Sequence, residues 1–112
     1  MKIKQVILFG FVALASMSLP AAEPPPETNT VVIDNFSFIP PRLTVPAGTK
    51  VTWINRDDVP HTVVSVDKQF KSPPLDTDEK FSRVFSTPGT NDYFCSIHSH
   101  MTGKIIVVAA PR

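Results

Sequence analysis

Two strand-like runs flank a turn in residues 80–95, which read KFSRVFSTPGTNDYFC. In the first run Phe81 and Phe85 fall on one face and Val84 on the other, because side chains alternate along a strand. The residues between the runs, Thr87-Pro88-Gly89-Thr90, fix or permit the dihedral angles of a turn. This stretch therefore predicts two strands joined by a short turn.

The same alternation of strand-like runs and turn residues continues in both directions along the chain. Strands are predicted over seven ranges: 30–34, 42–45, 50–55, 61–66, 80–86, 91–95 and 104–109. Their close spacing favours an all-β sandwich or barrel. The 12 prolines among 112 residues argue against a helical bundle, because proline interrupts helical hydrogen bonding. The longest stretch without a strand pattern is 67–79, so any short helix is expected there.

Composition excludes several classes of function. A chain of 112 residues forms one small domain. Its 11 basic and 10 acidic residues give a net charge of +1 without a basic cluster, so nucleic acid is not an expected partner. The single cysteine, Cys95, excludes an internal disulfide, a zinc ribbon with paired cysteines and a c-type haem attachment site.

The N-terminus has the features of a secretory signal. Lys2 and Lys4 precede an apolar run over 6–17, and small residues follow at Ala21 and Ala22. The run has about a dozen residues, whereas a membrane-spanning helix needs roughly 20. Residues 1–22 are therefore predicted to be a signal peptide that leaves no membrane span after its removal, and the destination is predicted to be the bacterial periplasm.

The rest of the chain divides into a spacer and a domain. Residues 23–29 include Pro24-Pro25-Pro26, which favours an extended polyproline II spacer. Residues 30–112 are predicted to form the folded domain.

Three metal-binding side chains lie close together in one predicted loop. Cys95, His98 and Met101 have the spacing C-x-x-H-x-x-M between two predicted strands, and His61 is the only histidine elsewhere that could complete the set. A thiolate, two imidazoles and a weakly bound thioether are the ligands of blue copper sites. Zinc also accepts cysteine and histidine, but its fourth ligand is usually a carboxylate, another cysteine or water. The donor set therefore favours copper over zinc.

Other conspicuous residues have simpler interpretations. His100 lies between two of these side chains in the sequence, so it is expected to point into solvent. Trp53 is expected in the core, and the acidic stretch 76–79 on a solvated face.

Three segments resemble the cupredoxin family, and within it amicyanin and the plastocyanin-like proteins. They are residues 45–55 (VPAGTKVTWIN), Pro60-His61, and residues 93–104 (YFCSIHSHMTGK). The resemblance implies a cupredoxin-like Greek-key β-sandwich of about seven to eight strands. It also implies one type 1 copper ion near one end of the sandwich, held by His61, Cys95, His98 and Met101.

The resemblance implies a monomeric protein that carries single electrons and is not an enzyme. Its expected partners are redox proteins such as a periplasmic dehydrogenase and a c-type cytochrome. The alternative is a periplasmic copper carrier or chaperone without a role in electron transfer. A copper oxidase or nitrite reductase is disfavoured, because three histidines cannot supply a second, histidine-rich copper centre.

The chain departs from the family pattern at two places. Thr62 follows the first ligand histidine where the family usually has asparagine, so a hydroxyl replaces the amide that links the two ligand loops. Ile97 and Ser99 flank the second histidine where amicyanin has prolines, which predicts a less rigid loop.

Overall fold

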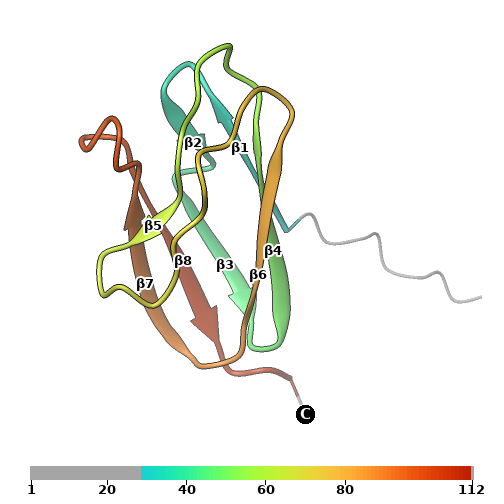
Figure 1. The fold of residues 1–112 in the computed structure, drawn as a ribbon. Helices are drawn as coiled ribbons and strands as arrows, with labels where there is room; N and C mark the ends of the chain where they lie inside the picture. The colour runs from blue at the N-terminus through green and yellow to red at the C-terminus, as the bar shows by residue number, and fades with distance from the viewer. Residues whose placement is uncertain (1–28, 112) are drawn as a thin grey trace, which may run out of the picture.

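The computed structural model describes residues 29–111, which form eight strands in two sheets (Figure 1). The strands are β1 (Thr30–Asp34), β2 (Ser37–Ile39), β3 (Arg42–Pro46), β4 (Thr49–Asn55), β5 (Val64–Ser65), β6 (Lys80–Phe85), β7 (Gly89–Phe94) and β8 (Thr102–Val108). The predicted β-sandwich is confirmed. The predicted signal peptide and nearly all of the predicted spacer lie outside the described residues.

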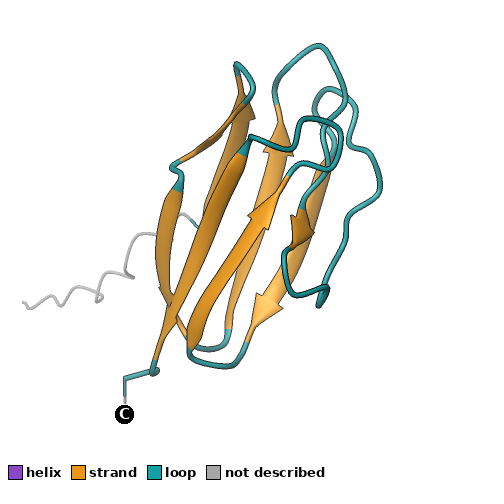
Figure 2. Cartoon of the chain, turned by 90° about the vertical axis from the view of Figure 1, so that its left-hand side faces the viewer, coloured by secondary structure: helices purple, strands orange, loops and turns teal. Residues whose placement is uncertain are grey.

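Each sheet combines strands from distant parts of the chain. The first has the order β2-β1-β4-β6, in which β1 is parallel to β4 and the other pairs are antiparallel. The second has the order β3-β8-β7-β5, in which β3 is parallel to β8. Figure 2 shows the two sheets stacked face to face. Because β3 joins the second sheet while β2 and β4 stay in the first, the chain crosses between sheets twice within this segment.

The core between the sheets is centred on Trp53. Its side chain is fully buried, as predicted, and its ring centroid lies 5.3–6.1 Å from those of four aromatic residues: Phe70, Phe81, Phe85 and Tyr93. Each such pair contributes about 0.5–1.5 kcal/mol beyond the burial of its surface. These contacts join both sheets to the segment between β5 and β6, so the core fixes the strands that carry the loops.

The structure differs from the predicted strands in two regions. The prediction missed β2, which is only three residues long and ends before Pro40 and Pro41. The strand predicted over 61–66 is reduced to β5. His61 and Val64 form only isolated bridges with the proline-interrupted segment 71–75, instead of a continuous ladder. No helix occurs in 67–79 or elsewhere in residues 29–111.

Loops from both sheets gather at one end of the sandwich (Figure 1). The turn between β1 and β2 meets the segment after β4, and that segment meets the loop between β7 and β8. Within residues 29–111 there is no helix long and apolar enough to cross a membrane.

Candidate metal centre

The loop between β7 and β8, residues 95–101, is closed at its base by main-chain hydrogen bonds. The Cys95 N–H donates to the Met101 carbonyl at 3.1 Å, and the Met101 N–H donates to the His98 carbonyl at 2.9 Å. We call residues 95–101 the Cys95 loop. These bonds bring the main chain of Met101 beside Cys95, and both side chains are buried.

His61 reaches the Cys95 loop from the segment between β4 and β5. Its main chain exchanges two hydrogen bonds with Leu75, at 3.2 and 2.7 Å, which hold the residue in place after Pro60. The imidazole is fully buried. His61 is 34 residues from Cys95 in the sequence, but the two side chains lie next to each other in the folded protein.

Three of the four predicted ligands present their donor atoms to one another. The Cys95 sulfur lies 3.7 Å from Nδ1 of His61 and 3.8 Å from Nδ1 of His98, and all three atoms lie within 4.8 Å of one another. A sulfur and a nitrogen bound to one ion at about 2.3 and 2.0 Å are about 3.7 Å apart in a trigonal plane and about 3.5 Å apart in a tetrahedron. The observed sulfur–nitrogen distances are therefore close to those of donors that bind one ion.

Met101 is the fourth predicted ligand. Its side chain is 3% exposed, and its main chain is fixed to both Cys95 and His98. A thioether is a soft donor, and its presence beside a thiolate and two imidazoles fits copper better than zinc.

Asp57 contacts Nε2 of His61, the ring nitrogen that does not face Cys95, and this contact was not predicted from the sequence. Its carboxylate lies 2.8 Å from Nε2 of His61 and accepts hydrogen bonds from the N–H groups of Asn35 and Phe36 at 2.6 and 2.9 Å. Burial alone would raise the pKa of Asp57, but the hydrogen bonds from Phe36, Asn35 and His61 hold it below its usual value. A carboxylate at Nε2 keeps the proton on that nitrogen and leaves Nδ1 free to bind a metal.

Cys95 is prepared to act as a thiolate. Burial raises the pKa of its thiol, but hydrogen bonds from the Thr62 N–H, from both histidines and from the Ile97 N–H outweigh burial and lower the pKa to about 6. The thiolate is the form of cysteine that binds metals. At neutral pH the Cys95 side chain is therefore mostly a thiolate, whose negative charge attracts a cation.

The hydroxyl of Thr62 links the two ligand-bearing segments. Its oxygen accepts a hydrogen bond from the Ser96 N–H at 2.7 Å and lies 2.8 Å from the Ser96 hydroxyl. A hydroxyl therefore does join the loops where the family usually has an amide.

Phe36 covers the histidine rings and was also missed. Its ring packs edge-to-face against His61 and His98, with centroid distances of 5.1 and 4.8 Å. Phe36 and Asn35 both have positive φ, 57° and 52°, which is unfavourable for a bulky side chain. Because the two Asp57 hydrogen bonds hold these residues, the same carboxylate orients His61 and fixes the turn that places Phe36.

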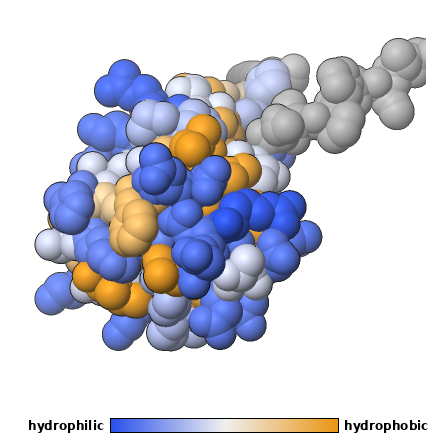
Figure 3. All heavy atoms as spheres, turned by 90° about the horizontal axis from the view of Figure 1, so that it is seen from above, coloured by the Kyte–Doolittle hydropathy of each residue, from blue (hydrophilic) through white to orange (hydrophobic). Residues whose placement is uncertain are grey.

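The tip of the Cys95 loop is open to solvent. His98 is half-buried, whereas Ile97, Ser99 and His100 are exposed. His100 is thus exposed, in agreement with the sequence analysis. Seen from this end of the molecule, apolar side chains are interspersed with polar ones (Figure 3).

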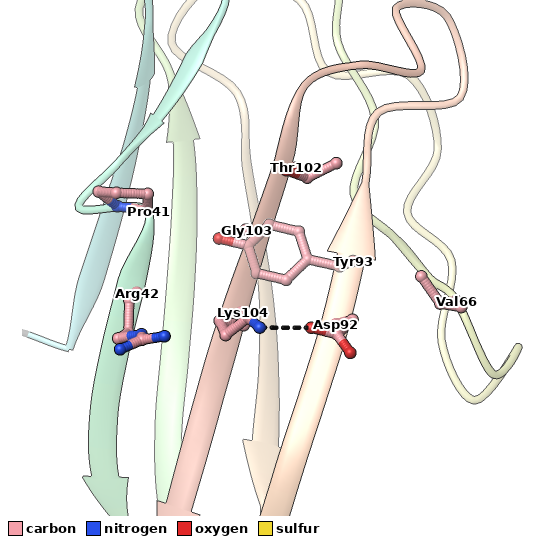
Figure 4. Close-up of a pocket in the computed structure, with 8 residues that line it drawn as sticks. All are labelled: Pro41, Arg42, Val66, Asp92, Tyr93, Thr102, Gly103 and Lys104. Carbon is pink, nitrogen blue, oxygen red and sulfur yellow. Dashed lines mark ion pairs between the residues drawn. The ribbon is translucent and has the colours of Figure 1, made fainter.

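A hollow on the second sheet lies away from these donors. It is lined by Arg42, the ion pair of Lys104 with Asp92, and Tyr93 with Gly103 (Figure 4). None of the four predicted ligands lines it. Gly103 has no side chain here for a steric reason, since a Cβ would lie 2.5 Å from the Tyr93 ring.

Comparisons with known proteins agree with the fold and the donor set. The family model for a cupredoxin-like domain matches residues 6–107. The chain is 37% identical over 101 residues to amicyanin-alpha of Methylorubrum extorquens, covering 85% of each protein. A purple cupredoxin from Nitrosopumilus maritimus superimposes with a TM-score of 0.68 at 35% identity, covering 70% of this chain and 98% of the other. A copper(I) form of an amicyanin mutant superimposes with a TM-score of 0.68 at 36% identity, covering 70% of this chain and 80% of the other.

Proposed function

The chain belongs to the cupredoxin-like family, and on that basis we propose that it binds one copper ion through His61, Cys95, His98 and Met101. It is a blue copper protein that transfers electrons, and it is not an enzyme. The observation that supports this ligand set best is the convergence of one sulfur and two nitrogens from two separate loops, with all three atoms within 4.8 Å of one another.

The residues around the donors favour rapid exchange of one electron. Copper bound by a thiolate, two imidazoles and a weak thioether changes oxidation state with little change in its ligands. Asp57 and the Leu75 main chain fix His61, and the closed base of the Cys95 loop fixes Cys95. Burial of His61, Cys95 and Met101 excludes water from the ligand side chains. Since the donors are already held in position, little reorganisation is needed on reduction or oxidation.

Electrons enter and leave through the end of the molecule where the ligand loops meet. His98 is the most exposed of the four predicted ligands, and exposed apolar side chains beside the ligand loops include Phe36, Ile39 and Ile97. A small, partly apolar surface suits the brief encounters of redox proteins. The partners we propose are a periplasmic dehydrogenase as electron donor and a c-type cytochrome as acceptor, with this chain acting as a monomer.

The proposed location is the periplasm, and the proposed domain comprises residues 30–112. The support is the signal-like pattern of residues 1–22. The mature N-terminus of protein secreted by a bacterial host tests this. A start near residue 23 agrees with the proposal, and an N-terminus that still includes Lys2 contradicts it.

The visible absorption spectrum of the copper(II) protein tests the function itself. An intense thiolate-to-copper band is expected in the wild type, and its loss is expected in Cys95→Ser. His100→Ala is the matched control, because it removes an exposed histidine from the same loop and should keep the band. A colourless copper-loaded wild type would contradict the proposal and favour a copper carrier or chaperone.

A further inference from the structure

The hydroxyl of Thr62 has three polar neighbours. Its oxygen lies 2.7 Å from the Ser96 nitrogen, 2.8 Å from the Ser96 hydroxyl oxygen and 3.8 Å from the Cys95 sulfur. Thr62 is buried, whereas Ser96 is exposed. The Thr62 hydroxyl therefore makes its hydrogen bonds mainly to these protein groups.

The directions of these hydrogen bonds follow from counting protons. A hydroxyl has one proton and two lone pairs, and a thiolate has no proton to donate. The Ser96 N–H occupies one lone pair of the Thr62 oxygen. All three contacts are satisfied together in one arrangement, in which the Ser96 hydroxyl donates to Thr62 and Thr62 donates to the Cys95 sulfur. In the reverse arrangement Thr62 donates to Ser96, and its contact with the sulfur carries no hydrogen bond.

We propose that Thr62 is a positioning residue that tunes the copper centre, with its hydroxyl held by Ser96 as a side-chain hydrogen-bond donor to the Cys95 sulfur. Two main-chain groups already donate to this sulfur: the Thr62 N–H, at 3.4 Å, and the Ile97 N–H. This inference rests on the proposed function. Reduction adds one electron and no proton, and it places more negative charge on the sulfur. A donor to that sulfur stabilises the reduced state more than the oxidised one and raises the midpoint potential.

Thr62→Val removes the hydroxyl with little change in shape and tests the proposal. At a fixed applied potential near the midpoint, the ratio of reduced to oxidised protein should fall about tenfold, which equals about 59 mV for one electron. Thr62→Ser keeps the hydroxyl and should restore the wild-type value. An unchanged potential in Thr62→Val, or a Thr62→Ser variant that matches Thr62→Val, would overturn the proposal.

Ser96→Ala distinguishes the two hydroxyl arrangements. It removes the hydroxyl–hydroxyl contact but keeps the bond from the residue-96 N–H to the Thr62 oxygen. If Thr62 already donates to the sulfur, the potential should stay near that of the wild type. In the reverse arrangement the variant would free the Thr62 proton for the sulfur and raise the potential, and that result overturns the proposal.

A direct readout needs no variant that might misfold. Electron–nuclear double resonance of the wild-type copper(II) protein in H₂O and D₂O should reveal three exchangeable protons beside the sulfur, those of the Thr62 N–H, the Ile97 N–H and the Thr62 hydroxyl, in addition to those of the histidine rings. Only the two main-chain protons would overturn the proposal. Absence of the blue copper signal in the wild type would instead mean that the proposed function had failed.

Discussion

The two segments that supply the predicted ligands are held in opposite ways. Residues 56–61, which we call the His61 segment, end in a fully buried imidazole that is fixed at its ring by Asp57 and at its main chain by Leu75. The Cys95 loop is fixed at its base and through Ser96 to Thr62, and its tip is exposed. The His61 segment therefore holds its ligand inside the protein, and the Cys95 loop brings His98 to the surface, where a partner can approach.

The largest expected effect is a difference in stability between two histidine variants. In the metal-free protein, His61→Ala should lower the free energy of unfolding by about 3 kcal/mol, because it leaves a cavity and removes a partner of the buried Asp57. His98→Ala should lower it by less than about 1 kcal/mol, since that side chain is half-buried. Urea unfolding of both variants measures the difference. Equal losses would show that the two segments are not held differently.

Asp57 contacts the His61 segment and not the Cys95 loop. Asp57→Asn should weaken copper binding by about 10- to 100-fold, because the carboxylate no longer holds the proton on Nε2 of His61. A competition titration with a chelator of known affinity measures this. Asp58→Asn is the control, since Asp58 is the exposed neighbour. Equal affinities of the two variants would refute the role of Asp57.

The base of the Cys95 loop depends on the close approach of Gly103 to Tyr93. Gly103→Ala should lower the free energy of unfolding by about 2 kcal/mol, because the new Cβ would overlap the buried tyrosine ring. Gly48→Ala is a contrasting control, in which space is available and any cost comes from a positive φ of 97°. Thermal unfolding of Gly103→Ala measures this loss. The Tyr93→Phe variant, measured in parallel, gives the effect of removing the hydroxyl alone, so the two effects can be told apart. A Gly103→Ala protein as stable as the wild type contradicts this account.

A smaller effect is expected in alkaline solution. Burial of its hydroxyl raises the pKa of Tyr93 to about 12. The folded state therefore holds this proton more tightly than the unfolded state, so stability is full below pH 10 and is lost as the pH rises toward 12. From about pH 9 to about pH 11, the wild type should lose about 1 kcal/mol relative to Tyr93→Phe. Parallel curves for the two proteins would contradict the assignment.

Most of the fold could be predicted from local pattern. The alternation of Phe81, Val84 and Phe85 survives in β6, where Phe85 is buried and Val84 is exposed. The short strand β2 could not be predicted, because its three residues have no periodicity and form a strand only by pairing with β1. The strand predicted over 61–66 is mostly absent for a related reason, because the segment 71–75 that lies beside it contains Pro73 and Pro74.

The site was partly predictable as well. Cys95, His98 and Met101 lie within seven residues, so their spacing alone indicated a metal site. Asp57 could have been noticed four residues before His61, but an aspartate in a polar turn has no feature that identifies it as buried. Phe36 had no signal, because its position over the histidines depends on a strained turn and a carboxylate more than 20 residues away.

X-ray absorption at the copper edge measures which atoms surround the ion. We expect one short sulfur neighbour and two nitrogen neighbours in the wild type, loss of the sulfur in Cys95→Ser and loss of one nitrogen in His61→Ala. A copper ion surrounded only by nitrogen and oxygen, or one whose shell does not change in His61→Ala, would contradict the convergence of the two loops on one ion.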